Sequence, residues 1–397
     1  MRTKEGLVAA IKHILWISDH GAPVGGCERY VRETADLLRA EGIRSSLMYQ
    51  VHGALDADYL KAFDGAYPCV DPELQIQDIA PDFIYVHRLS GVELTRKITA
   101  VPIPKARFFH DHKLFCLREH KYTTLGHRTC TRPVGAHCYG CLGFVNRMER
   151  WPGVRLHTLG ALRREQRANL AFDAFILGSS YMREHIVAHG FPAARAHVVP
   201  LYAFPRSPDP SIVRDARLFL IVGQLLRGKG LDYVFEAMRR CQHRDARLLV
   251  VGSGRQEAMY RALARKLGVD ARIEFIGRMA SAELERMMQR ATCLLFPSRS
   301  PETFGLVGVE AMRFATPVIA MRVGGVTEWL EDGVNGLLVP PGDAQALAEA
   351  MDRLMDDEQL RQRLGEGGIQ RYRQRFTPQR HVRRLIEVFE QVTEAAC

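Results

Sequence analysis

Short apolar runs alternate with helical patterns along the chain, and this alternation constrains the fold more than any other feature. The first run, His13–Asp19, is continuous and apolar, as in a strand buried on both faces. A glycine loop over 21–26 and a helical pattern over about 27–40 follow it. Further candidate strands lie at 44–50, 82–87, 107–110, 174–178 and 196–200. The alternation predicts an α/β fold, with a parallel sheet covered by helices on both faces.

The same alternation restarts after a linker rich in proline and polar residues at 203–216. The second series of candidate strands lies at 218–223, 247–251, 273–276, 293–297 and 318–321. We therefore expect two Rossmann-like domains that face a cleft, over residues 1–202 and 203–378. Residues 379–397 carry apolar side chains at helical spacing, which predicts an amphipathic helix that packs back towards the first domain.

Charge is distributed unevenly along the 397 residues. The net formal charge is +10, while residues 101–170 alone hold 13 basic and 4 acidic side chains. Such a patch favours an anionic partner: a phosphate-bearing substrate, an acidic lipid surface or nucleic acid. A composition of 47% apolar and 25% charged residues excludes a disordered chain. No apolar run approaches the ~20 residues of a membrane span, and the start does not resemble a secretory signal, so we expect a cytoplasmic location.

Two glutamates eight positions apart, Glu302 and Glu310, are the first candidate site residues. They straddle a glycine turn that follows a strand and opens a helix near Gly305. Backbone N–H groups at the start of this helix, those of Gly305, Leu306 and Val307, would favour a phosphate. Glu310 could accept hydrogen bonds from ribose hydroxyls, and Glu302 from the hydroxyls of a sugar.

Other turns in the second half carry basic or glycine residues directly after a strand. Arg227 and Lys229 lie two positions apart, so both can reach one diphosphate. Gly252 and Gly254 form only half of a dinucleotide fingerprint, which weakens a dehydrogenase interpretation. Arg278 follows a third strand. Because the carboxyl ends of parallel strands meet at one edge of a sheet, these turns together predict a pocket for a nucleoside diphosphate.

The order of the glycine loop (Gly25, Gly26), the basic turn, the Gly-x-Gly turn and the Glu-x7-Glu segment resembles family 4 of the glycosyltransferases. The resemblance covers most of the chain. It implies the GT-B fold and transfer of a sugar from a nucleoside diphosphate with retention of configuration and without a catalytic metal. It also implies that Arg227 and Lys229 hold the diphosphate, Glu310 the ribose and Glu302 the donor sugar. Gly324, Gly325 and Glu328 would line the donor side.

His110 ends a candidate strand of the first domain, where members of this family often carry a histidine close to the donor sugar. Beside Asp111, its ring could hydrogen-bond a sugar hydroxyl and stabilise charge in an oxocarbenium-like transition state. A structural histidine at the end of a strand is the alternative. The catalytic candidates are therefore His110, Glu302, Arg227 and Lys229.

Four of the nine cysteines cluster in an expected insertion of the first domain at about 112–150: Cys116, Cys130, Cys138 and Cys141. The two-residue gap between Cys138 and Cys141 would let both sulfur atoms reach one tetrahedral metal ion. A structural zinc ion is one interpretation; free thiols, a disulfide or an iron–sulfur cluster are the others. Nearby histidines leave the ligand set open.

The main hypothesis is therefore a retaining hexosyltransferase that uses a UDP or GDP sugar. Its acceptor would be a saccharide or a lipid-linked intermediate of polysaccharide or glycoconjugate synthesis. A leucine- and arginine-bearing helix at 155–171 suggests peripheral contact with an anionic membrane at its inner face, although its leucines could equally pack on the sheet. The alternatives are a zinc-containing protein that binds nucleic acid or another polyanion, and a GT-B sugar-nucleotide epimerase. Sparse aromatic residues in the basic stretch make nucleic acid the less favoured partner.

Overall fold

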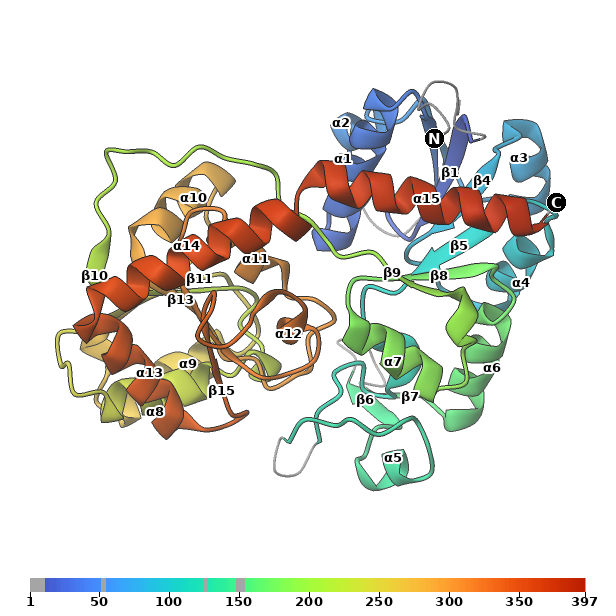
Figure 1. Ribbon diagram of the computed structural model, residues 1–397. Helices are drawn as coiled ribbons and strands as arrows, with labels where there is room; N and C mark the ends of the chain where they lie inside the picture. The colour runs from blue at the N-terminus through green and yellow to red at the C-terminus, as the bar shows by residue number, and fades with distance from the viewer. Residues whose placement is uncertain (1–10, 51–54, 124–127, 148–153, 397) are drawn as a thin grey trace. The chain divides into compact units, whose positions relative to one another are not determined.

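The computed structural model describes residues 11–50, 55–123, 128–147 and 154–396, and the chain divides into two compact units (Figure 1). Unit 1 comprises the described residues of Met1–Glu119, Pro133–Val199 and Pro378–Cys397. Unit 2 comprises those of His120–Arg132 and Pro200–Thr377. Within the described residues, no helix is both long and apolar enough to cross a membrane.

Unit 1 is built on a parallel sheet of seven strands in the order β3-β2-β1-β4-β5-β8-β9. These strands are β1 (His13–Ser18), β2 (Arg44–Tyr49), β3 (Gly65–Pro68), β4 (Phe83–Val86), β5 (Lys105–Phe108), β8 (Ala174–Leu177) and β9 (Ala196–Val198). Every residue of β1 is buried, as expected for a central strand with both faces covered. The strand order reverses between β1 and β4, which is where open α/β sheets usually bind ligands.

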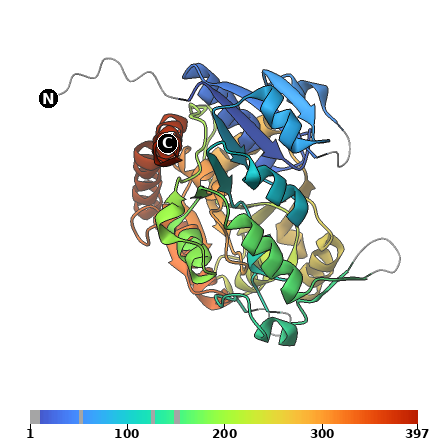
Figure 2. The same ribbon diagram turned by 90° about the vertical axis from the view of Figure 1, so that its right-hand side faces the viewer.

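Helices flank this sheet, and the C-terminal helix is one of them (Figures 1 and 2). The helices of unit 1 are α1 (Gly26–Ala40), α2 (Ala57–Leu60), α3 (Pro72–Ile79), α4 (Val92–Ala100), α5 (His137–Gly140), α6 (Leu159–Asn169), α7 (Ser180–Ala188) and α15 (Pro378–Ala396), with 3-10 turns η1 (Lys113–Phe115) and η2 (Ala193–Arg195). Two short antiparallel strands, β6 (Val145–Arg147) and β7 (Val154–Leu156), pair with each other. Helix α15 packs against α1, and its Phe389 ring stacks on Phe83 of β4, with 4.3 Å between centroids.

Unit 2 is built on a parallel sheet of six strands in the order β12-β11-β10-β13-β14-β15. The strands are β10 (Asp215–Val222), β11 (Arg247–Val251), β12 (Ile273–Gly277), β13 (Ala291–Phe296), β14 (Val318–Met321) and β15 (Leu337–Val339). Its helices are α8 (Leu231–Arg240), α9 (Glu257–Lys266), α10 (Ser281–Arg290), α11 (Leu306–Met312), α12 (Val326–Trp329), α13 (Ala344–Asp356) and α14 (Glu358–Arg375), with 3-10 turns η3 (Arg227–Lys229) and η4 (Asp270–Arg272). Here the strand order reverses between β10 and β13.

The two parallel sheets confirm the predicted pair of Rossmann-like domains. The main difference concerns the insertion at about 112–150, which the sequence analysis assigned to the first domain as a whole. Its middle part, the described residues of His120–Arg132, groups instead with unit 2. The reason is local contact: the Thr129 hydroxyl donates a hydrogen bond to the carbonyl of Arg299, at 2.7 Å.

Candidate functional site

In unit 2, the loops that follow β10 and β13 meet at the point where the strand order reverses. The backbone N–H groups of Arg299 and Ser300 both donate to the carbonyl oxygen of Gly228, at 2.9 and 3.1 Å. Arg299 is buried, forms an ion pair with Asp232 and lies over the Tyr233 ring. These contacts fix the basic turn η3 against the loop that carries Glu302.

The Glu302 carboxylate is the centre of this arrangement. Its Oε1 atom accepts hydrogen bonds from Lys229 Nζ at 2.7 Å and from Ser298 Oγ at 2.6 Å. Its backbone is held as well, because Gly325 N donates to the Glu302 carbonyl at 2.7 Å. A side chain at Gly324, where φ is +55°, would clash with that carbonyl. The predicted site residues Lys229 and Glu302 are thus brought together, and Gly324 and Gly325 support the loop of Glu302.

The glycine turn after β11 packs against the loop that follows β10. A side chain at Gly252, where φ is +136°, would clash with the Gly223 carbonyl, and one at Gly254 would approach the Leu225 backbone too closely. Arg278 Nε donates to Ser253 Oγ at 3.3 Å, so the third predicted turn lies beside the second. Gly252 and Gly254 therefore allow close contact between the loops after β10 and β11. This structural role was not predicted from sequence, where the two glycines were considered as part of a dinucleotide fingerprint.

The other residues of unit 2 that were predicted to bind the nucleotide-sugar donor are more scattered. Arg227 is exposed, and its Nη2 atom lies 3.7 Å from Met259 Sδ on α9. Gly305 directly precedes α11, whose first turn contains Leu306 and Val307, and Glu310 lies partly exposed one turn further on. Glu328 forms an ion pair with Arg375 of α14 at 2.9 Å, so its carboxylate stabilises the packing of α14.

Residues 120–123 and 128–132 contribute a contact that the sequence analysis missed. A β-bridge joins Tyr122 to Thr129, and the Tyr122 ring lies next to Gly228. Gly228 is flanked by Arg227 and Lys229, so a segment from the insertion touches the turn predicted to bind diphosphate. No sequence signal pointed to this contact, because nearly 100 residues separate the two segments.

In unit 1, His110 pairs with a second histidine. Its Nε2 atom lies 2.8 Å from His87 Nδ1, and both rings contact the Tyr30 ring. Burial, together with the nearby charges of Arg88 and Arg107, lowers the pKa of His110 to about 3. Burial also lowers the pKa of His87 well below its usual value. His110 is therefore a neutral imidazole near neutral pH, which can exchange hydrogen bonds with hydroxyls but carries no charge.

Gly25 and Gly26 lie at the start of α1 in unit 1, and the next residue, Cys27, faces the histidine pair. The ligand atoms of Cys27, His87 and His110 lie within 4.8 Å of one another. Burial raises the pKa of the Cys27 thiol well above its usual value, which disfavours the thiolate that binds metals. The cluster thus joins the start of α1 to the histidine pair.

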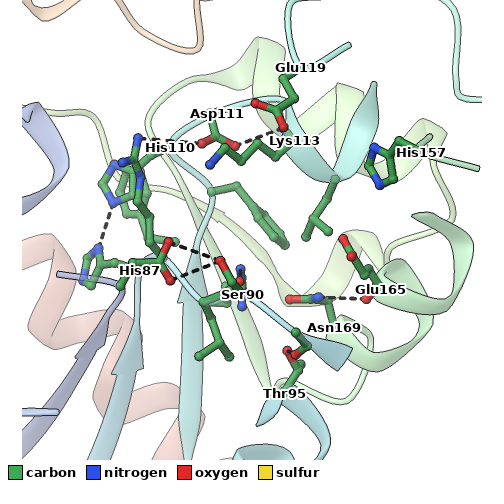
Figure 3. Close-up of a pocket in the computed structure, with 18 residues that line it drawn as sticks. His87, Ser90, Thr95, His110, Asp111, Lys113, Glu119, His157, Glu165 and Asn169 are labelled. Atoms are coloured by element: carbon green, nitrogen blue, oxygen red, sulfur yellow. Dashed lines mark hydrogen bonds and ion pairs between the residues drawn. The ribbon is translucent and has the colours of Figure 1, made fainter. Parts of the chain in front are cut away.

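A cavity of about 290 Å³ opens beside the histidine pair, within unit 1 (Figure 3). It lies at the carboxyl ends of β1, β4 and β5, where the strand order of this sheet reverses. Figure 3 shows His87 and His110 on one side and Glu165 and Asn169 on the opposite side. Asp111, Lys113 and Glu119 border it from above in that view. Charged groups of both signs thus line a space of the size of a small polar ligand.

The four cysteines of the insertion are divided between the units. Cys116, Cys138 and Cys141 belong to unit 1 and Cys130 to unit 2. Among the described residues, the sulfur atoms of these three cysteines of unit 1 do not all lie within 4.8 Å of one another. Cys138 Sγ lies 3.6 Å from His137 Nε2, on the short helix α5. The expected zinc site stays a prediction.

The basic helix predicted at 155–171 corresponds mainly to α6. Leu159 and Leu162 are buried and pack with Leu117. Arg163, Arg164 and Arg167 are exposed. The helix therefore uses its leucines within unit 1 and presents arginines to solvent.

The fold and the meeting of strand ends in unit 2 define a GT-B architecture, and solved structures match it over nearly the whole chain. The structure of Anabaena Alr3699/HepE in complex with UDP has a TM-score of 0.72 and 19% identity, covering 94% of this chain and 98% of that one. Sucrose-phosphate synthase from Thermosynechococcus elongatus also has a TM-score of 0.72, with 22% identity, covering 97% of this chain and 100% of that one. At this identity the match shows the fold, and the predicted fold class is confirmed.

Sequence comparison finds similar proteins for about half of the chain. The model of the family described as Glycosyl transferases group 1 matches residues 206–371. Over 190 residues, 34% are identical to a D-inositol 3-phosphate glycosyltransferase of Corynebacterium efficiens, covering 46% of this chain and 44% of that one. Over 179 residues, 31% are identical to O-antigen chain mannosyltransferase C of Escherichia coli, covering 45% and 47%. The match spans about half the length of these curated relatives.

Proposed function

We propose that the protein is a retaining glycosyltransferase. It transfers a hexose from a nucleoside-diphosphate donor to an acceptor hydroxyl in the synthesis of a surface polysaccharide, lipid-linked glycan or glycoconjugate. The observation that carries the proposal is the hydrogen-bonded group of Lys229, Glu302 and Ser298 where the strand order of unit 2 reverses. This group lies in the part of the chain that matches the model of Glycosyl transferases group 1.

In this proposal Lys229 and Arg227 bind the diphosphate. The Lys229 ammonium has three donors, so it can keep its bond to Glu302 while it donates to phosphate oxygens. Glu302 then accepts hydrogen bonds from hydroxyls of the donor sugar, and Glu310 from those of the ribose. The start of α11 offers N–H groups that have no acceptor within the helix.

The transfer breaks the bond between the anomeric carbon and the oxygen of the leaving phosphate, and forms a bond from that carbon to the acceptor oxygen. The acceptor proton passes to the departing phosphate, so no protein base is required. His110, neutral at the pH of a cell, orients a sugar hydroxyl without adding repulsion to an oxocarbenium-like transition state.

The nucleotide is the least constrained part of the donor. UDP is favoured over GDP because the structurally similar Anabaena protein was solved with UDP and with UDP-glucose. We place the enzyme in the cytoplasm, with peripheral contact at the inner face of an anionic membrane through the exposed arginines of α6. Since the leucines of α6 are buried, such contact would be electrostatic and would disappear at high salt.

Nucleotide binding tests the proposal directly. The melting temperature of the protein should rise with UDP or GDP at millimolar concentration, and less with ADP or dTDP, because a ligand that binds the folded state stabilises it. The sugar is then found by incubating the protein with sugar derivatives of the preferred nucleotide and measuring released nucleoside diphosphate. No shift with any of the four nucleotides would refute the proposed function.

A further inference from the structure

Arg107 is a buried cation whose charge is not neutralised at close range. It lies on β5 with 6% of its surface exposed, and it lines the cavity of unit 1. Among the described residues, its Nε and Nη1 atoms have no hydrogen-bond partner, and its Nη2 atom makes a long contact, 3.5 Å, to the Leu89 carbonyl. Burying a charged group without a partner is costly, so the position of Arg107 calls for a ligand.

The Phe109 and Phe172 rings lie beside the Arg107 guanidinium, at 5.7 and 5.8 Å from their centroids. Burial lowers the pKa of Arg107 to about 10, which still leaves it charged near neutral pH. Arg88 differs, because it lies 3.8 Å from Glu28 and 3.9 Å from Asp111. Arg107 is thus a buried cation of this cavity that an incoming anion would neutralise.

Other groups that line the same cavity also have unsatisfied polar atoms. They are Asn169 Oδ1, Arg88 Nε and His87 Nε2, all of them buried. Asn169 is 3% exposed, and its amide nitrogen is already used by the Glu165 carbonyl at 2.8 Å. Its free carbonyl oxygen needs a donor, such as a hydroxyl.

The carboxylates that line the cavity also restrict which ligands can bind there. Asp19, Asp111, Glu119 and Glu165 line it together with Lys113, and the charges of Asp19, Asp111 and Glu165 act on Arg107. Carboxylates would repel a ligand that is anionic throughout, but they accept hydrogen bonds from hydroxyl groups. The cavity therefore fits a ligand that carries one oxyanion next to several hydroxyls.

We propose that this cavity binds the acceptor, and that the acceptor is an anionic sugar or polyol whose carboxylate or phosphate lies against Arg107. The inference rests on the proposed function, which assigns the nucleotide to unit 2 and leaves the cavity of unit 1 for the second substrate. Arg107 neutralises the oxyanion, Lys113 adds a second positive charge, and Asn169 with Glu165 binds hydroxyls.

Calorimetric titration with three probes tests this assignment: D-glucuronate, D-glucose 6-phosphate and D-glucose. The two charged probes separate a carboxylate from a phosphate, and glucose measures the contribution of hydroxyls alone. Wild-type protein should bind at least one charged probe about tenfold or more tightly than glucose, because a hydrogen bond to a charged group is strong. Arg107→Gln should abolish this difference.

The matched control is Arg96→Gln, which removes an exposed arginine from α4 outside the cavity and should leave all three affinities unchanged. Should Arg107→Gln fail to fold, Lys113→Gln serves in its place. Lys113 is exposed, and its loss should weaken the charged probes severalfold without affecting glucose. Equal affinity of wild-type protein for all three probes, or no binding of either charged probe at 10 mM (roughly the weakest affinity of interest), would overturn the inference.

A parallel titration with UDP and GDP distinguishes failure of the anionic-acceptor proposal from failure of the proposed function. If a nucleotide binds and the charged probes do not, the anionic acceptor is wrong while the glycosyltransferase proposal stands. If no nucleotide binds, the proposed function itself fails. Arg107→Gln should keep wild-type affinity for the nucleotide, because Arg107 belongs to unit 1 and the nucleotide turns to unit 2.

Discussion

Lys229, Glu302 and Ser298 form a compact polar group in which each member restrains the others. Glu302 is 15% exposed and Lys229 is 35% exposed, so the pair is partly shielded from water and accessible to a ligand. A donor with both a diphosphate and sugar hydroxyls can satisfy the cation and the carboxylate at once. The pair thus stabilises its loop, and in the proposed function it also binds the donor.

Substitution of the two residues should separate binding from turnover. Lys229→Ala should weaken nucleotide binding by about tenfold or more, since a charge-assisted contact contributes ~1.5–3 kcal/mol. Glu302→Gln should lower kcat more than it weakens UDP or GDP binding, because its proposed partner is the sugar. Lys266→Ala, an exposed lysine at the end of α9, is the control and should behave as wild type. Wild-type nucleotide affinity in Lys229→Ala would contradict its assignment.

The low pKa of His110 predicts how the free energy of unfolding depends on pH. Its pKa is about 3 in the folded protein, against 6.5 for an exposed histidine, so the unfolded chain binds a proton that the folded chain does not. This contribution to stability is complete above pH 6.5 and is lost as the pH falls towards 3. Urea unfolding between pH 5 and 7 should therefore show a free energy of unfolding that falls less steeply with decreasing pH in His110→Gln than in the wild type. Equal slopes would contradict the low pKa.

The individual residues also show how far sequence alone can reach. Lys229 and Glu302 could be placed at one sheet edge because each follows a strand, and parallel strands end at the same edge. Ser298 and Arg299 could not, since nothing in their type or spacing separates them from ordinary loop residues. Arg107 was also missed: an alternating or apolar strand pattern does not reveal a buried charge, which becomes visible only when its neighbours are known.

Among the elements, the insertion is the part of the chain that sequence patterns described least well. Its strands are short, its only described helix, α5, spans four residues, and its middle segment associates with unit 2 through Thr129. Most sheet strands were predicted to within a few residues because burial on both faces dictates a continuous apolar run. The edge strands β3 and β15 were not predicted. No comparable constraint acts on a loop-rich insertion, so its contacts had to come from the structure.

Metal content tests the insertion directly. If Cys138 and Cys141 form part of a zinc site, elemental analysis of protein purified without a histidine tag should give one zinc ion per chain. Cys138→Ser should lower this content severalfold, and Cys69→Ser, a half-buried cysteine outside the insertion, should not. Nucleotide binding should survive removal of the metal. Absence of zinc and iron from the wild-type protein, with all four thiols titratable, would end the metal hypothesis.

At the scale of the whole molecule, each unit has its own sheet, its own reversal of strand order and its own polar cluster at that place. Unit 2 carries the turns suited to a diphosphate, while unit 1 carries the cavity with Arg107. The GT-B architecture was predictable from the duplicated alternation of strands and helices. The proposed division of substrates between the units was only partly predictable, because residues from several distant segments form the cavity of unit 1.

Hydrogen exchange can map this division in the intact protein. Binding of the preferred nucleotide should slow amide exchange at 223–230 and 298–306, where the loops after β10 and β13 are joined through the Gly228 carbonyl. Residues 120–123 and 128–132 should be protected as well, although they lie far away in sequence, because Tyr122 and Thr129 contact the same loops. Unit 2 has a cavity of about 320 Å³ lined by Arg214, Glu358 and Arg361, among others. Amide exchange around this cavity serves as an internal control. Protection at that cavity in place of the strand-end loops would move the nucleotide away from Lys229 and Glu302.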